Sequence, residues 1–481
     1  MLPTDIDELE NAPEDDFDLL AELDANVDVH DIETVAGDHC FVMQLDFSKV
    51  KSVKITGQSD HADMRSMESQ LEEAIGLAEA IDLKIVATSI TRVNKFTPAT
   101  MFGKGKVEEL GKMLNKHRAQ LVVVNTVLTP VQQRNLEEAW GVKVLDRTGL
   151  ILEIFGARAE TKEGKLQVAL ANLNYQRGRL VRSWTHLERQ RGGTGFIGGP
   201  GETQIESDRR AIQVRISKLE KQLAQVKRTR GLHRTARKKV PYPIVALVGY
   251  TNAGKSSLFN VLSGADVMVK DMLFATLDPT MRQVELPTGL TIIMSDTVGF
   301  ISNLPHELVA AFRATLEEVL EADLILHIED IAHNDHEAQG LDVNIILQGL
   351  GVGDEYPIPI VRVWNKTDLL SDEDREAVNN TAAEDNDIIP ISAVKSIGLH
   401  ELSKRIESVL QKDHHFYQLQ LSPARGAELA WVYRHCQVKQ RDDLEDGTID
   451  LNVMVDDKHH EQFKNKFHME LGLDMREEWE K

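Results

Sequence analysis

Apolar and polar residues alternate in two separate stretches of the chain, and in each stretch short apolar runs take turns with helical patterns. The runs of the first stretch are FVMQLDF (41–47), LKIVATSI (83–90), QLVVVNTVL (120–128) and VKVLD (142–146). Between them, SQLEEAIGLAEAI and KVEELGKMLNKH carry apolar residues at the spacing of amphipathic helices. This alternation predicts a small parallel sheet with its helices.

The second stretch begins after VPYP at 240–243, which marks a boundary. Its apolar runs are PIVALVG, GLTIIMSD, ADLILHIED and IPIVRVWNK, each followed by a helical pattern. We expect a mostly parallel, doubly wound sheet. After about residue 415, AELAWVYRH favours a helix, TIDLNVMV a strand and HEQFKNKF a helix, so a small α/β appendage is expected.

Between the two stretches the apolar period is purely helical. The stripes are Leu166, Leu170, Leu173, Arg177, Leu180, Trp184 and Leu187, then Ile205, Ile212, Ile216, Leu219, Leu223 and Val226. They predict an antiparallel hairpin of two long helices, joined by RGGTGFIGGPGETQ at 191–204. Six glycines in the first eleven residues of this loop exceed what a turn needs, so either something approaches or bends this backbone, or the loop is a plain connector.

Charge is distributed unevenly along this chain, whose formal net charge is −22. The first 40 residues hold 14 Asp or Glu and no Lys or Arg, which favours a flexible arm. Residues 161–240 hold 19 Lys or Arg against 6 Asp or Glu, and seven of the basic residues lie in KRTRGLHRTARKK at 227–239. Such a basic module is typical of a polyanion site, with a solvated helical surface as the alternative.

Cysteine content and hydropathy argue against several classes of protein. Cys40 and Cys436 lie far apart, and neither has a cysteine nearby, so no disulfide framework and no CxxC zinc site is expected. No run approaches 18 apolar residues, and the N-terminus is acidic where a signal peptide is basic and then apolar. We therefore expect a cytoplasmic protein.

The strongest chemical motif is GYTNAGKSS, which follows the apolar run IVALV and opens a helical pattern. It matches the phosphate-binding loop GxxxxGK[ST], whose backbone N–H groups surround the β-phosphate. We expect Lys255 to bridge the β- and γ-phosphates and Ser256 to ligate Mg²⁺. The residues expected to contact the nucleotide are Gly249, Tyr250, Thr251, Asn252, Ala253, Gly254, Lys255, Ser256 and Ser257.

Two later motifs, NKTD and SAVK, select the base. The Asp368 carboxylate can accept both N1–H and N2–H₂ of guanine, whereas adenine presents an acceptor at N1. We expect Asn365 to tie its loop to the phosphate-binding loop, and the stem of Lys366 to cover the base. Ser392 and Ala393 follow the run IIPI, and the Ala393 N–H can reach guanine O6. The predicted nucleotide is GTP.

The motifs FATLDPT and DTVGF lie between these and are expected at the γ-phosphate and Mg²⁺. Asp296 can hold Mg²⁺ through a water, and the Gly299 N–H can sense the γ-phosphate. Thr276 is the preferred threonine to close over Mg²⁺, and Thr280 is the alternative. The nucleotide-binding residues expected here are Phe274, Ala275, Thr276, Leu277, Asp296, Thr297, Val298 and Gly299.

Phe300 stands where Ras-like switches carry the glutamine that orients water, and it has no hydrogen-bonding group. Turnover therefore needs another device. Asn252 stands where potassium-dependent GTPases place an asparagine that ligates K⁺; the alternative is that Asn252 only ties the loop to neighbouring backbone. The residues assigned to catalysis are Lys255, Thr276, Gly299 and Asn252.

Over about residues 60–412 these motifs closely resemble the HflX family of ribosome-associated GTPases. The segments that carry the resemblance are RTGLILEIFGARAETKEGKLQVALA, RGGTGFIGGPGETQIESDRR, GYTNAGKSSLFN, FATLDPT, DTVGF and LPHELVAAFRATLEEV. The resemblance implies a protein that binds the large ribosomal subunit and its rRNA, splits stalled ribosomes and hydrolyses GTP. It also implies that the hairpin tip reaches the peptidyl-transferase centre. Here the tip reads GFIGGPGE where many members read GTRGPGE, so an arginine is missing.

The predicted fold class is α/β, in five parts. They are an acidic flexible arm (1–40), an N-terminal parallel α/β domain (41–156), a basic antiparallel helical hairpin (157–240), a doubly wound P-loop G-domain (241–412) and a small C-terminal α/β domain (413–481). We expect a monomer without a membrane partner. The alternative function is a non-enzymatic RNA-binding or ribosome-assembly factor that uses GTP as a conformational clamp. GKGK is interpreted as a turn with two solvated lysines rather than as an ATP site.

Overall fold

The computed structural model describes residues 38–49, 65–184, 204–237, 242–264, 273–274, 276, 280–287, 289–302, 318–411, 414–444 and 447–467. Most of the acidic arm and the glycine-rich loop lie outside these residues. The contacts separate two compact units. The first unit holds the N-terminal sheet and its helices, and the second holds the hairpin, the larger sheet and the C-terminal region.

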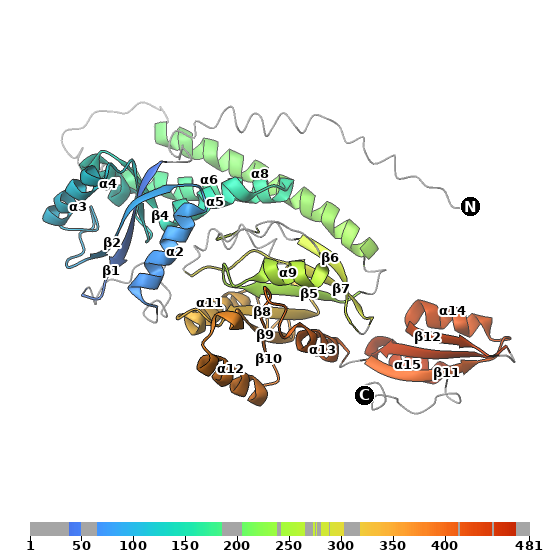
Figure 1. Ribbon diagram of the computed structural model, residues 1–481. Helices are drawn as coiled ribbons and strands as arrows, with labels where there is room; N and C mark the ends of the chain where they lie inside the picture. The colour runs from blue at the N-terminus through green and yellow to red at the C-terminus, as the bar shows by residue number, and fades with distance from the viewer. Residues whose placement is uncertain are drawn as a thin grey trace. The chain divides into compact units, whose positions relative to one another are not determined.

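The first unit is a four-stranded parallel sheet in the order β2-β1-β3-β4, which confirms the expected parallel sheet (Figure 1). Its elements are β1 (His39–Asp46), α2 (Met67–Glu79), β2 (Lys84–Arg92), α3 (Lys104–His117), β3 (Leu121–Val124), α4 (Pro130–Trp140) and β4 (Lys143–Asp146). Phe41, Met43, Leu110 and Val122 are buried in its core. GKGK does not form a turn: it opens α3, and Lys106 Nζ lies 2.9 Å from Glu109 Oε1.

The predicted helical hairpin is present as α6 (Lys162–Trp184) and α8 (Gln204–Arg237), after α5 (Arg147–Arg158). The two long helices lie side by side in Figure 1, and Arg177 Nη1 donates to Gln213 Oε1 at 2.9 Å. The buried positions of the two stripes include Leu166, Leu173, Ile216, Leu219 and Leu223. The basic tract forms the last part of α8 as far as Arg237.

The larger sheet of the second unit has six strands in the order β10-β9-β8-β5-β7-β6. Only β6 runs antiparallel to its neighbour, so the mostly parallel sheet is confirmed. Its elements are β5 (Ile244–Gly249), α9 (Lys255–Ser263), β6 (Thr280–Glu285), β7 (Thr291–Asp296), β8 (Leu324–Asp330), α11 (His336–Gly349), β9 (Ile360–Asn365), α12 (Asp372–Glu384), β10 (Ile388–Pro390) and α13 (Leu399–Leu410).

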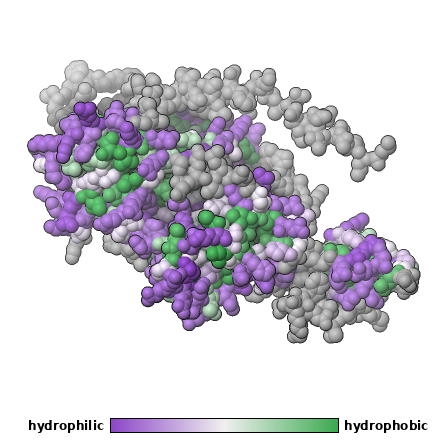
Figure 2. Space-filling model, viewed as in Figure 1, coloured by the Kyte–Doolittle hydropathy of each residue, from purple (hydrophilic) through white to green (hydrophobic). Residues whose placement is uncertain are grey.

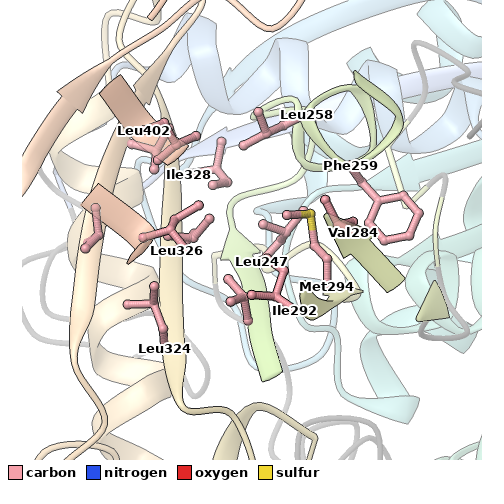
Figure 3. Packing of buried hydrophobic residues seen from close by; sticks show 14 of the residues in the cluster. Leu247, Leu258, Phe259, Val284, Ile292, Met294, Leu324, Leu326, Ile328 and Leu402 are labelled. Atoms are coloured by element: carbon pink, nitrogen blue, oxygen red, sulfur yellow. The ribbon is translucent and has the colours of Figure 1, made fainter. Parts of the chain in front are cut away.

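Apolar side chains from alternate strand positions form the core on one face of this sheet (Figure 3). Leu247, Leu326 and Ile328 extend from β5 and β8, while Phe259 and Leu402 come from α9 and α13. Because this packing fixes α9 against the strands, the loop between β5 and α9 is held at the carboxyl edge of the sheet.

The C-terminal region forms a three-stranded antiparallel sheet in the order β11-β13-β12. Its elements are β11 (His414–Leu421), α14 (Gly426–His435), β12 (Gln437–Asp443), β13 (Ile449–Asp456) and α15 (Asp457–Lys466). The helix, strand and helix expected here are found, and β11 and β12 are additional. On the face drawn in Figure 2, hydrophilic residues cover much of the described surface. None of the described helices is long and apolar enough to cross a membrane.

Candidate functional site

The candidate phosphate-binding loop connects β5 to α9, and Lys255 is the first residue of that helix. Gly254 precedes it with a φ of 93°, a conformation that favours glycine. A Cβ atom on Gly254 would lie 2.2 Å from Asn365 Nδ2, and one on Gly249 would lie 2.2 Å from the Ile328 carbonyl oxygen. Glycine is therefore required at both positions, and the N-terminus of α9, at the positive end of the helix dipole, is suited to an anion.

The Lys255 ammonium is buried over this loop. Its Nζ donates to the carbonyl oxygens of Gly249 at 3.1 Å and Tyr250 at 2.8 Å. Burial lowers the pKa of Lys255 to about 8, and the nearby charge of Asp296 acts in the opposite direction. A buried ammonium gains from a bound phosphate, because the anion supplies the charge pairing that it loses when it leaves water.

Three side-chain oxygens converge beside the loop. Ser256 Oγ donates to Asp296 Oδ2 at 2.7 Å, Thr276 Oγ1 donates to the same oxygen at 3.0 Å, and the two hydroxyls lie 2.9 Å apart. Burial raises the pKa of Asp296, and its other oxygen, Oδ1, is buried without a hydrogen-bond partner among the described residues. Hard oxygen ligands and an unsatisfied carboxylate oxygen fit Mg²⁺.

The alternative threonine, Thr280, occupies a different position. It is the first residue of β6, where its backbone pairs with that of Asp296 across the antiparallel ladder. The hydroxyl close to Ser256 and Asp296 is that of Thr276. The geometry therefore favours Thr276 of the two candidates.

The DTVGF segment lies directly against the phosphate-binding loop. The Phe300 N–H donates to the Gly249 carbonyl at 3.0 Å, and the Thr251 N–H donates to the Phe300 carbonyl at 2.8 Å. A Cβ atom on Gly299 would lie 2.9 Å from Thr251 Cγ2 and 3.1 Å from Lys255 Nζ. Phe300 is buried, so its side chain is not available to a water molecule at the site.

Asn365 joins three loops at the expected base site. Its Nδ2 donates to the Ala253 carbonyl at 2.9 Å, and its Oδ1 accepts from the Ala393 N–H at 3.0 Å. Asp368 accepts from Ser392 Oγ at 2.7 Å and lies 3.9 Å from Lys395 Nζ. The tie from Asn365 to the phosphate-binding loop is thus present, and Asp368 lies beside the SAVK loop.

Several predicted contacts to nucleotide are used within the protein in this structure. The Ala393 N–H, expected at guanine O6, is donated to Asn365 Oδ1. The Thr297 hydroxyl donates to the Leu247 carbonyl at 2.6 Å. The Lys366 ammonium lies 2.8 Å from Asp330 Oδ2, and the predicted contact of its stem with the base stays a prediction. Ala275 and Leu277 lie outside the described residues.

Asn252 and Phe274 both have positive φ angles, 60° and 56°. Asn252 is exposed, and its side chain makes no hydrogen bond to any described residue, which disfavours a purely local backbone tie. Phe274 is instead buried, with its ring edge-on to that of Phe155 on α5, the centroids 4.8 Å apart. The motif that carries Phe274 is therefore anchored to the helix that precedes the hairpin.

Sequence patterns missed a buried cluster behind the loop. In this cluster, Arg65 donates hydrogen bonds to Tyr250, Ser302 and Asp335. The Tyr250 hydroxyl also donates to Ser302. They are single polar residues far apart along the chain, so no local spacing indicates them. The feature that reveals the cluster is the buried Arg65, which contacts both the phosphate-binding loop and the segment after DTVGF. These contacts are visible only in the folded chain.

The loop at the N-terminus of α9, the oxygens beside it and the Asn365 junction define a P-loop GTPase. Four family models match consecutive segments: GTP-binding GTPase N-terminal (68–156), GTP-binding GTPase Middle Region (158–237), 50S ribosome-binding GTPase (244–366) and HflX C-terminal domain (377–479). The last begins within α12, so it includes part of the predicted G-domain.

Curated relatives are similar over most of their length. The GTPase HflX of Magnetococcus marinus is 50% identical over 378 residues, which are 79% of this chain and 86% of the relative. That of Escherichia coli is 39% identical over 403 residues, which are 84% of this chain and 92% of the relative. A GTP-binding protein from Sulfolobus solfataricus, solved in complex with GDP, has a TM-score of 0.41 at 23% identity and covers 78% of this chain and 99% of its own.

This chain belongs to the HflX family of GTPases. It binds GTP and hydrolyses it.

Proposed function

We propose that this protein binds the large ribosomal subunit and splits or rescues stalled or idle ribosomes during its GTPase cycle. The observation that carries the proposal is α8, a helix of 34 residues with basic residues on its exposed surface. Those described as exposed include Arg209, Arg210, Lys218, Lys221 and Arg228. The match to a 50S ribosome-binding GTPase model over the adjacent sheet supports it. A long basic rod of about 50 Å is suited to reach into a polyanion such as rRNA.

Sedimentation of intact ribosomes with this protein and a non-hydrolysable GTP analogue tests the proposal. We expect the ribosome peak to separate into subunits, with the protein in the large-subunit fraction. Intact ribosomes with bound protein would support the alternative, a factor that uses GTP as a conformational clamp. Ribosome-stimulated, multiple-turnover GTP hydrolysis would then be absent.

A charge variant shows whether the hairpin carries the contact. Replacement of Arg209, Arg210, Lys218 and Lys221 by Gln should weaken ribosome binding. It should also flatten the slope of log affinity against log salt concentration, by up to about one for each lost phosphate contact. GTP affinity should not change. A matched control replaces four exposed lysines of the first unit, namely Lys84, Lys104, Lys112 and Lys116. Equal loss in both variants would contradict a hairpin-specific site.

We further propose roles for the residues at the site. Ser256 and Thr276 would hold Mg²⁺, Asp296 would bind it through a water, and the ion would neutralise charge on the phosphates. Lys255 bridges the β- and γ-phosphates, and the Gly299 N–H binds the γ-phosphate. Asp368 selects guanine. The convergence of the three oxygens is what supports the metal assignment.

K⁺ stimulation is a separate proposal for Asn252. The side chain is exposed on the phosphate-binding loop and makes no bond to described residues, so its amide oxygen is available to a monovalent cation. Hydrolysis rates in K⁺ and Na⁺ at fixed ionic strength, in the unmodified protein and in Asn252→Ala, test it. Equal rates in both salts contradict the proposal, and a K⁺ effect that survives the substitution assigns the cation to other residues.

The five-part domain division, the monomeric state and the cytoplasmic location stay predictions. Limited proteolysis tests the domain boundaries, and sedimentation equilibrium tests the monomer.

A further inference from the structure

Arg65 lies two residues before α2 along the chain, and its side chain is buried among residues of the nucleotide-binding sheet. Its Nη1 donates to Tyr250 Oη at 3.0 Å and to Ser302 Oγ at 2.7 Å. Its Nε lies 3.5 Å from Asp335 Oδ2, just before α11. The side chains of Arg65 and Asp335 are only 4% and 9% exposed, so this is a desolvated ion pair. Burying such a pair costs desolvation free energy, which hydrogen bonds to the buried groups offset. Here the Arg65 guanidinium makes hydrogen bonds to Tyr250 and Ser302.

Tyr250 is the centre of this cluster. Its hydroxyl accepts from Arg65 and from the Ser302 N–H at 2.9 Å, and it donates to Ser302 Oγ at 3.0 Å. A phenol oxygen has one proton and two lone pairs, so all of its capacity is used. The guanidinium also lies 5.6 Å from the centroid of the Tyr250 ring. The position of the hydroxyl is therefore fixed from three directions.

The cluster joins two segments that take part in the GTPase site. Tyr250 is the second residue of GYTNAGKSS, and Ser302 follows Gly299 by three residues. Between them, the Phe300 backbone is paired with Gly249 and Thr251. Because Arg65 contacts both Tyr250 and Ser302, it holds the end of the DTVGF segment against the phosphate-binding loop.

We propose that Arg65 is a positioning residue for GTP hydrolysis. It acts through Tyr250 and Ser302 to keep the Gly299 N–H at the distance from the phosphate-binding loop that the transition state requires. The inference rests on GTP hydrolysis and on the proposed role of Gly299, and not on ribosome splitting.

Single-turnover hydrolysis of GTP by the full chain without ribosomes tests this role. In Arg65→Met, we expect the rate at saturating GTP to fall about tenfold, because a small misplacement of a catalytic segment is costly. The dissociation constant for GTP should change less than about twofold, since the binding residues remain. Ser302→Ala should cause a similar loss, and the double variant should be no slower than Arg65→Met, because both substitutions break the same connection.

Three further variants separate positioning from general stability. Tyr250→Phe keeps the ring and removes only the hydroxyl, so it tests the cluster even where Arg65→Met unfolds. Arg65→Lys keeps the charge beside Asp335 but not the planar fork, and should recover folding stability more fully than rate. Arg405→Met removes a G-domain arginine that lies against Asp387, and should leave the rate unchanged.

Rates within twofold of the unmodified protein in both Arg65→Met and Tyr250→Phe would overturn the proposal, even with lowered thermal stability. Losses that multiply in the double variant would also overturn it, because independent effects do not share one connection. Since no ribosome is present, these outcomes do not depend on the ribosome-splitting proposal.

Discussion

The carboxyl edges of the N-terminal sheet and of the larger, mostly parallel sheet differ in the contacts that their polar groups make. At the carboxyl ends of the N-terminal strands, side chains bind one another: Asn125 Nδ2 donates to Gln44 Oε1 at 2.6 Å, and Arg147 Nη1 donates to Asn125 Oδ1 at 2.7 Å. At the corresponding edge of the larger sheet, the loop is so close to its neighbours that only glycine fits at Gly249 and Gly254, and Asp296 Oδ1 lacks a partner among the described residues. The edge of a parallel sheet is thus a possible place for a ligand, and a glycine loop at a helix N-terminus beside an unsatisfied carboxylate oxygen makes it a site.

The largest effect is expected at Lys255. Lys255→Met should lower the single-turnover rate of GTP hydrolysis by about a thousandfold, because it removes the buried ammonium that we propose bridges the β- and γ-phosphates. Folding stability should hold or rise, since a buried lysine with a lowered pKa costs free energy to bury. Quenched-flow kinetics with urea denaturation of the same sample measures both. A rate that stays within tenfold would contradict the assignment.

Arg147→Met should show the reverse pattern. Arg147 is buried and paired with Glu73, so removing it breaks a buried ion pair and should cost about 3 kcal/mol of unfolding free energy. Hydrolysis per folded molecule should not change. A loss of hydrolysis as large as that of Lys255→Met would show that the N-terminal cluster is part of the GTPase site, and the contrast between the two sheets would fail.

Asp368→Asn should change the base specificity of nucleotide binding from guanine to xanthine. An amide in place of the carboxylate replaces one acceptor by a donor. This change should weaken GTP binding by about 2 kcal/mol and favour the binding of xanthosine triphosphate. Competition between the two nucleotides, followed by fluorescence, gives the ratio directly. Equal weakening of both would mean that Asp368 serves only to bind Ser392.

The smallest effect concerns pH. The pKa of Lys255 is lowered to about 8 in the folded protein, and a bound phosphate raises it again, so binding takes up a proton once pH exceeds about 8. GTP affinity should therefore be flat below pH 8 and fall by up to about tenfold per unit above it. Stability without nucleotide has the opposite sign: the unfolded chain holds the Lys255 proton up to about pH 10.5, so unfolding becomes harder as pH rises from 8. Lys255→Arg should abolish both trends.

Local patterns predicted the parts of the fold whose signal is local. The strands that become β5, β7, β8 and β9 are apolar runs, and the phosphate-binding loop follows from nine consecutive residues. By contrast, β12 (QVKQRDD) has one apolar residue and is a strand because it pairs with β13. β6 (TMRQVE) likewise lies at the edge of its sheet. Polar edge strands carry little hydrophobic pattern, so pairing and not sequence defines them.

The site shows the same limit at the level of single residues. The roles of Asn365 and Ser256 belong to motifs, and the structure places both where their motifs imply contact. Arg65 meets Tyr250 across 185 residues of sequence and Ser302 across 237. Contacts at such separations depend on how whole elements pack, and no window of sequence contains both partners.

The length of α8 has a mechanical consequence. The helix ends at Arg237, and β5, which leads into the phosphate-binding loop, begins at Ile244. A rigid rod of 34 residues is a lever: a tilt of about 5° at its base carries the far end through about 4 Å, given a rise of 1.5 Å per residue. A rotation of a few degrees at Arg237 is therefore converted into a displacement of about a side chain's width at Gln204.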